Sequence, residues 1–384
     1  MATAINGRGD LHVRVVSRCL VKASDSSMEP HVLALSNLDL VPQPIQVAML
    51  CVYRKPPATD FGAVVAAFQA GLPSLLNHFF PLAGRIATNP SSGVPEVRCY
   101  NQGAELVVGE AGAALASLDY GDVGASLQRI QLPYSADVAL SVQVVSFACG
   151  GFTVAWRTSH LLVDGSALSS LVTAWSVLAR TGTLAAGARP NHDRSVLRLR
   201  EEASRDGGRR ATRVQAVSAY LWKALAGVAP RRHARLLRQR RRLRGAGGER
   251  GGGHGARGGR GAGVRRAPPG AGGLGGGAQD RTVRYIEAAS IVLGSPAVIV
   301  TAFASFPIVT DFGLGHAAMA VPMSVPTARL CSGYVEIIAR PGGDGSWIVK
   351  ALLWPQLAAA LEADEPRVFK LVTAVYLGLF DHTL

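Results

Sequence analysis

The chain has 384 residues, of which 48% are hydrophobic and 17% charged, a content that is ordinary for a soluble protein. This length suggests two domains that each bury a core. Five widely spaced cysteines without a C-x-x-C pair argue against a disulfide framework or a zinc site and fit a reducing compartment. The net charge of +14 is local, because residues 231–266 hold 13 arginines and one acidic residue and the rest of the chain is nearly neutral.

Hydrophobic periodicity predicts regular elements over the first 180 residues. Apolar residues at helical spacing predict a helix over 59–77, with Thr59 or Asp60 as its N-cap and a stop at Pro81. The pair Gly150-Gly151 between two apolar runs predicts a hairpin. The other expected elements are strands over 11–21, 45–53, 97–100, 105–108, 141–147 and 152–158, a turn or loop over 33–40, and a helix over 167–179.

The sequence changes character after residue 180. A polar, proline-containing stretch over 181–210 predicts a linker, and apolar spacing predicts a helix over 211–228. From 231 to 277, 38 of 47 residues are Gly, Ala, Arg or Pro. Such a segment buries too little apolar surface to offset its ordering entropy, so disorder is predicted over about 230–281. Because these four residue types have codons rich in G and C, we hypothesise that this segment is out-of-frame or mis-spliced sequence.

Order is expected to resume near residue 282. Residues 291–309 carry no charge and are long enough to span a bilayer. Pro296, Pro307 and many β-branched residues favour a buried strand pair or a strand followed by a loop, so no membrane span is expected. The last predicted helix covers 352–362. The N-terminus has early charges and no apolar core of a signal peptide, which favours a cytoplasmic protein.

His160, with Asp164 and Gly165 after it, is the first candidate site. It lies between a predicted strand and a predicted helix, and a neutral imidazole there can accept a proton near pH 7. The alternative is a core histidine near a helix start, with Asp164 as the helix cap. The strand before and the helix after favour a general base.

The second candidate is the run Asp311-Phe312-Gly313-Leu314-Gly315. Two glycines around a bulky residue predict a tight loop whose backbone lies close to another element, and Asp311 could pair there with an arginine. The alternative is an ordinary glycine-rich turn.

Other chemistries find little support in the sequence. No P-loop, dinucleotide fingerprint or metal-ligand cluster occurs, so no metal and no permanently bound cofactor are expected. The arginine-rich run attracts phosphate, yet it lacks aromatic residues for base stacking. A specific nucleic-acid partner is therefore not expected, although an Arg/Gly-rich nucleic-acid-binding protein remains an alternative.

In this order and separation, the His160 and Asp311 motifs resemble those of the plant BAHD acyl-CoA-dependent acyltransferases. The similarity covers most of residues 10–228 and 282–384. Four further segments are similar to that family: 35–39, 75–86, 147–152 and 216–223.

The resemblance implies an α/β fold of two chloramphenicol-acetyltransferase-like domains, each a mixed β-sheet flanked by helices, with a channel between them. The expected domains are residues 1–180 and 211–384, joined by the linker 181–210. The second domain would be incomplete, since the family has sheet and helix where residues 231–281 stand.

The resemblance also implies a reaction. His160 would deprotonate a hydroxyl or amine of a small plant metabolite, which then attacks the thioester of an acyl-CoA co-substrate without a covalent acyl-enzyme. Asp164 would shape the loop through a salt bridge, and Gly165 would let the backbone turn. Asp311, Phe312, Gly313 and Gly315 would hold the domain contact away from the chemistry, with Leu314 replacing the family's usual aromatic residue.

The resemblance leaves several points open. A monomer is expected. A catalytically inactive relic of the family is the main alternative. The acyl donor, the acceptor, the oxyanion donor and the CoA contacts are open.

Overall fold

The computed structural model describes residues 11–35, 45–122, 124, 126–192, 217–218, 220–221, 224, 298–306, 308–324, 333–363 and 368–379. The segment 230–281, with its predicted disorder and the out-of-frame hypothesis, lies outside these residues. So does most of the helix predicted over 211–228. The described residues of that helix are helical, and Leu221 among them is buried.

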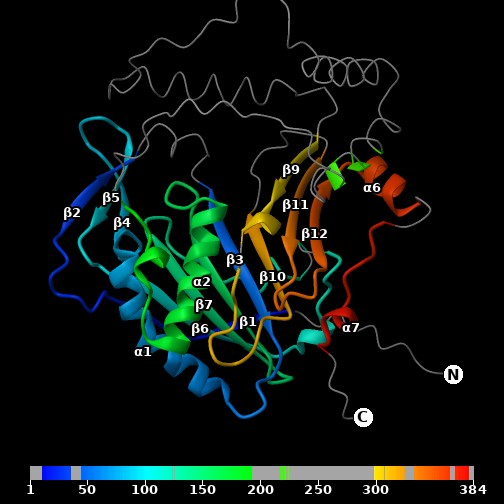
Figure 1. Ribbon diagram of the computed structural model, residues 1–384, viewed down its shortest axis with the longest axis horizontal. Coiled ribbons are helices and arrows are strands. Elements are labelled where there is room, and N and C mark those ends of the chain that lie inside the picture. Colours follow the sequence, from blue (N-terminus) through cyan, green and yellow to red (C-terminus); the bar gives the residue numbers. More distant parts are fainter. Residues whose placement is uncertain are drawn as a thin grey trace, which may run out of the picture.

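A mixed six-stranded sheet forms the centre of the molecule (Figure 1), in the order β1-β6-β7-β8-β3-β10. Neighbouring strands are antiparallel except for the parallel pair β6 and β7. Strand β10 comes from much later in the chain than the other five, so distant parts of the sequence share one sheet. The strands are β1 (Val13–Val21), β3 (Gln46–Tyr53), β6 (Ala104–Ala111), β7 (Leu140–Phe147), β8 (Phe152–Ser159) and β10 (Met319–Ser324).

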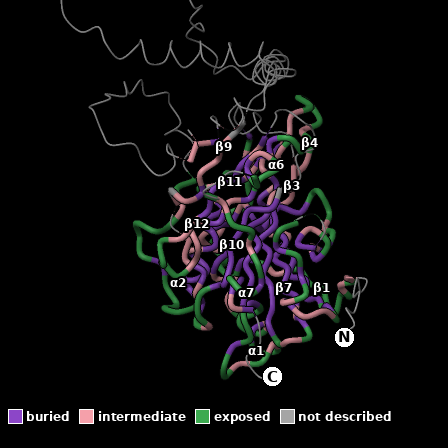
Figure 2. The backbone as a smooth tube through the Cα atoms, turned by 90° about the vertical axis from the view of Figure 1, so that its right-hand side faces the viewer, coloured by how far each residue is buried: buried purple, intermediate pink, exposed green. Residues whose placement is uncertain are grey.

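Two helices, α1 (Phe61–His78) and α2 (Gly165–Thr181), cover one face of this sheet. The buried stretches follow the central strands (Figure 2), which are buried along nearly their whole length. Trp156 of β8 packs against Phe68 of α1 and Trp175 of α2, with ring centroids 5.8 and 5.9 Å apart. Gly71 of α1 makes room for this packing, because a Cβ there would lie 2.6 Å from the Trp175 ring.

The expected elements of the first 180 residues are largely confirmed. The predicted hairpin is the antiparallel pair of β7 and β8, and Gly150 in its turn has a φ of +77°. Helix α1 begins after Asp60, whose carboxylate accepts from the Ala63 amide at 2.7 Å. The helix ends at His78, before the short 3-10 helix η1 (Phe80–Ala83) that contains Pro81.

A small three-stranded sheet corrects the loop expected over 33–40. Strand β2 (His31–Ala34) pairs antiparallel with β5 (Pro95–Cys99), which also pairs with β4 (Arg85–Thr88). The expectation was wrong for residues 33 and 34, because partners more than 60 residues away draw them into a strand. Residues 36–40 lie outside the described part, and β4 was not expected.

A further three-stranded sheet holds β9 (Val298–Ala302), β11 (Gly333–Ala339) and β12 (Trp347–Leu353), in the order β12-β11-β9. We call the six-stranded sheet the first sheet and this one the second sheet. Within 291–309, the described residues form β9 and then the 3-10 helix η5 (Phe303–Ser305), which agrees with the expected strand followed by a loop. Residues 300–302 of the strand are partly buried rather than buried. None of the helices in the described ranges combines the length and apolar character needed to cross a membrane.

Helix α6 (Pro355–Glu362) follows β12. The helix predicted over 352–362 therefore begins too early, because its first two residues end β12 and pair with residues 334 and 333 of β11. Pro355 opens the helix, where its missing N–H costs nothing. The chain then returns to the first sheet through α7 (Ala374–Leu377), whose Leu377 and Gly378 carbonyls accept from the Arg54 guanidinium at 2.6 and 2.7 Å.

Candidate active site

His160 lies in the turn that joins β8 to α2, as the sequence predicts. Its backbone N–H donates to the carbonyl of Ile45 at 2.9 Å, which continues the pairing of β8 with β3. The amides of Leu162 and Val163 both donate to the Ser159 carbonyl, at 3.0 and 3.4 Å. The backbone of His160 is thus held on the strand side by β3 and on the helix side by a closed turn.

The imidazole of His160 is only partly buried. Its Nδ1 is fully buried and has no hydrogen-bond partner within the described residues. A proton exchanged between His160 and a bound molecule would therefore pass through Nε2, the other ring nitrogen.

Asp164 is the N-cap of α2. Its side chain is exposed and accepts from the Ala167 amide at 2.8 Å, while its carbonyl accepts from Leu168. An aspartate at this position satisfies an amide that the helix leaves unpaired. Among the described residues, Asp164 forms no salt bridge of the kind expected. Its hydrogen bonds there are those of a helix cap, the alternative interpretation.

Gly165, the first residue of α2, is required for space. It does not adopt a positive φ, so its backbone needs no left-handed conformation, and the turn expected of it stays a prediction. A Cβ at this position would lie 2.8 Å from Cε1 and 3.0 Å from Cζ of Phe303. A side chain from the later part of the sequence thus packs directly against the backbone of the His160 motif.

The second motif forms the expected tight loop. Gly313 and Gly315 have φ values of +101° and +85°, a region that favours glycine. Both of their amides donate to Oδ1 of Asp311, at 2.9 and 3.0 Å. Asp311 therefore organises its own loop, and none of the ion pairs between described residues involves it.

Phe312 anchors this loop in the core of the first sheet. Its ring meets those of Tyr53, Phe68 and Trp175 at centroid distances of 5.2, 5.4 and 6.5 Å. Leu314 is partly buried against the same core. The Asp311 carbonyl accepts from the Ser176 hydroxyl of α2. At the helical rise per residue, Ser176 lies about 16 Å along α2 from Gly165, so the Asp311 loop is well separated from the start of the helix.

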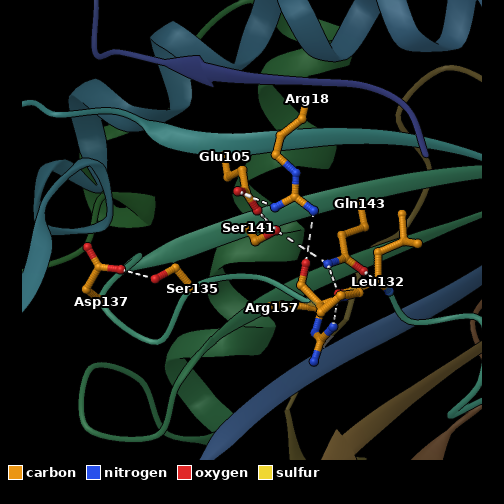
Figure 3. Close-up of polar contacts among 9 residues, drawn as sticks. Arg18, Glu105, Leu132, Ser135, Asp137, Ser141, Gln143 and Arg157 are labelled. Carbon is orange, nitrogen blue, oxygen red and sulfur yellow. Dashed lines mark hydrogen bonds and ion pairs between the residues drawn. The ribbon is translucent and has the colours of Figure 1, made fainter.

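A polar cluster on the opposite face of the sheet escaped the sequence analysis. It consists of Arg18, Glu105, Ser141, Gln143 and Arg157 (Figure 3). Because Trp156 faces the helices, its neighbour Arg157 faces the other side. Glu105 accepts from Arg18 at 2.6 Å and from Ser141 at 2.9 Å. Gln143 and Arg157 both donate to the Leu132 carbonyl, so the cluster fastens the loop around residue 132 to the sheet.

Burial shifts the pKa values of Arg157 in this cluster and of the neighbouring Tyr134. The Arg157 guanidinium lies over the Tyr134 ring, 4.9 Å from its centroid. Burial raises the pKa of Tyr134 to about 12, against the opposing charge of Arg157, and burial also lowers the pKa of Arg157. The signal in the sequence was a charged or polar residue in each of three apolar strands, but only the register brings residues 105, 141 and 157 side by side.

Comparison with known proteins shows which family this chain is related to. The Transferase family matches residues 11–205, just over half of the chain. A hydroxycinnamoyltransferase of Narcissus pseudonarcissus is 32% identical over 178 residues, which are 44% of this chain and 39% of that protein. A hydroxycinnamoyl-CoA:5-hydroxyanthranilate N-hydroxycinnamoyltransferase of Avena sativa is 32% identical over 182 residues, 43% and 40% of the two chains. The matches span about two fifths of the length of these relatives.

Solved structures share the fold over a longer stretch. Vinorine synthase superposes with a TM-score of 0.58 and 16% identity, over 91% of this chain and 98% of that chain. TRI101 of F. graminearum, complexed with ethyl coenzyme A, gives a TM-score of 0.59 and 11% identity, over 88% and 98%. With the two motifs placed as described, these findings show that the chain belongs to the Transferase family of plant BAHD acyltransferases and has its chloramphenicol-acetyltransferase-like fold of mixed sheets.

Proposed function

We propose that the protein transfers an acyl group from an acyl-CoA to a hydroxyl or amine of a small plant metabolite, with His160 as general base. The observation that carries this proposal is the setting of His160. Its backbone is held between β8 and α2, its Nδ1 is buried, and the residue as a whole is only partly buried. Membership of the acyltransferase family supports the same reaction class.

The reaction needs one proton acceptor. Nε2 of His160 takes the proton of the acceptor, whose oxygen or nitrogen attacks the thioester carbonyl. The tetrahedral intermediate collapses, the carbon–sulfur bond breaks, and the CoA thiolate takes the proton from the imidazolium. The acyl group passes directly to the acceptor, so no acyl-enzyme forms. A positioned base contributes a factor of about 10² to 10⁴ in rate.

The acyl donor is open among hydroxycinnamoyl, benzoyl, acetyl and malonyl thioesters. Hydroxycinnamoyl-CoA is the first donor to test, because several relatives are named hydroxycinnamoyltransferases. Acyl-CoA as co-substrate fits a fold whose neighbours include TRI101 complexed with coenzyme A. We further propose a cytoplasmic monomer that holds no permanent cofactor and makes no specific contact with nucleic acid or membrane.

The test is a panel of the four donor classes against phenolic alcohols and polyamines, with release of free thiol as the readout. We expect His160→Ala to lower turnover by at least about 100-fold, the loss of a general base. His12→Ala is the control: residue 12 is exposed and precedes β1, which β6 and β7 separate from β8. Turnover by His160→Ala at the wild-type rate would refute the assignment.

An inactive relic is the second candidate, because the family match ends at residue 205 although the fold continues beyond it. This candidate predicts no thiol release with any donor and no rise in melting temperature on addition of CoA. A variant with the reading frame of residues 230–280 restored would then regain turnover. Turnover by the present chain excludes the relic.

A further inference from the structure

We infer that Phe303 is a positioning residue for His160, acting through the backbone of Gly165; this inference rests on the proposed function. Phe303 opens η5, directly after β9 of the second sheet. Gly165 opens α2, five residues after His160. The contact between them joins the second sheet to the loop that carries the proposed base, across 138 positions of the sequence.

The contact is close and enclosed. Cε1 and Cζ of Phe303 would lie 2.8 and 3.0 Å from a Cβ on Gly165, which real Cβ atoms do not tolerate. Phe303 is only 7% exposed and belongs to the main core cluster. Its ring also meets Phe306 edge to face, with centroids 6.3 Å apart. Because the ring is packed on several sides, it resists displacement and fixes the position of the first turn of α2.

The chain after Phe303 runs beside α2 and fastens it at two further points. The Val309 amide donates to the Thr173 hydroxyl at 3.1 Å, and the Ser176 hydroxyl donates to the Asp311 carbonyl. The loop of residues 311–315 and the His160 loop therefore lie at opposite ends of one contact along the helix. Of the three contact points on α2, the one between Gly165 and Phe303 is nearest to His160.

Movement at Gly165 reaches His160 over a short path. The turn from Ser159 to Val163 is closed by backbone hydrogen bonds, and Asp164 caps the helix that follows. Such a path has few free torsions, so a shift of the helix start moves the imidazole. A displacement of about 1 Å in a catalytic group can lower a rate about 100-fold.

The first test compares Phe303→Leu with Phe369→Leu, the same substitution at a partly buried ring that packs against a separate cluster of buried residues around Val335 and Ile337. Leucine lacks the outer ring atoms that touch Gly165 but keeps an apolar side chain at position 303. We expect Phe303→Leu to raise hydrogen exchange of amides 160–166 about tenfold, which corresponds to easier local opening. In the same variant kcat should fall about 10- to 100-fold while KM for the acyl-CoA changes less than twofold. Phe369→Leu should leave both readouts near the wild type.

The second test is a rescue. Gly165→Ala places a methyl group against the ring, so its kcat should also fall, and Phe303→Leu in the same chain should restore at least about fivefold of it because the space is returned. Additive losses, or equal effects of the two leucine variants, would overturn the inference. Hydrogen exchange needs no turnover. If the wild type is inactive, the proposed function is refuted. If amides 160–166 nevertheless exchange faster in Phe303→Leu and not in the control variant, the contact between Phe303 and Gly165 still positions the His160 loop.

Discussion

Asp164 and Asp311 each direct a carboxylate at the backbone of their own loop. Asp164 accepts from the Ala167 amide, and Asp311 accepts from those of Gly313 and Gly315. Short acidic side chains favour such local contacts, which replace backbone hydrogen bonds at turns and helix starts. At this scale both motifs shape the backbone around them, and the Gly165 contact with Phe303 adds a steric constraint.

Asp311 offers a test of whether its charge or its hydrogen bonding matters. We expect Asp311→Ala to lower the free energy of unfolding by about 1–3 kcal/mol, because two amides of a tight loop lose their acceptor. Asp311→Asn keeps the Oδ1 acceptor and should cost less than about 1 kcal/mol. Denaturant unfolding followed by fluorescence measures both. Equal destabilisation by the two variants would instead indicate a charged partner for Asp311.

Strands β11 and β12 are joined by a buried ion pair. Glu336 and Lys350 are direct partners in the register, and Lys350 Nζ lies 2.5 Å from Glu336 Oε2. The same ammonium donates to the Pro322 carbonyl of β10 at 2.8 Å, which links the second sheet to the first. Burial raises the pKa of Glu336, and the charge of Lys350 opposes that rise. Each ion depends on the other because both side chains are almost fully buried.

Removing one partner of this pair should be costly. We expect Lys350→Met to destabilise the fold by about 3–5 kcal/mol, since Glu336 is left buried and unpaired. Replacing both, as Lys350→Met with Glu336→Leu, should recover most of that loss. Arg14→Met is the control, because Arg14 and Glu110 form an exposed pair at 66% and 53% exposure that contributes at most about 1 kcal/mol. Thermal melts give the comparison, and a double variant as unstable as the single one would argue against the ion pair as the cause.

Across the whole molecule, the later part of the chain completes the first sheet. Strand β10 covers the edge of β3, Phe312 fills a space among the aromatic rings of the first core, and Arg54 holds the carbonyl end of α7. The division into domains 1–180 and 211–384 stays a prediction, but the first of these does not contain all the residues of its own sheet.

A chain truncated after residue 192 should therefore fold poorly. Without β10, the edge of β3 would be exposed. Without Phe312, a cavity would form among the aromatic rings of the first core, and loss of a buried aromatic ring alone costs about 3–5 kcal/mol. We expect no cooperative thermal transition and strong binding of a hydrophobic dye, with the full chain as the control. A sharp melt of the truncated chain near that of the full chain would show that the first sheet is stable without β10.

The sequence by itself determined the features that depend on near neighbours. The Asp60 cap of α1, the Gly150 turn between β7 and β8, and His160 between a strand and a helix all follow from residues a few positions apart. Periodicity states which face of an element is buried, and caps and glycines mark where it starts and turns.

Only the tertiary structure decided which partner covers each face. Leu33 joins a strand through Val97, Lys350 finds Glu336 and the carbonyl of β10, and Gly165 must be small because Phe303 lies against it. None of these partners is encoded in local periodicity, since contact between residues far apart in the chain depends on register and on the path of the backbone in space. That is also why the proposed general base was visible in the sequence and the side chain proposed to position it was not.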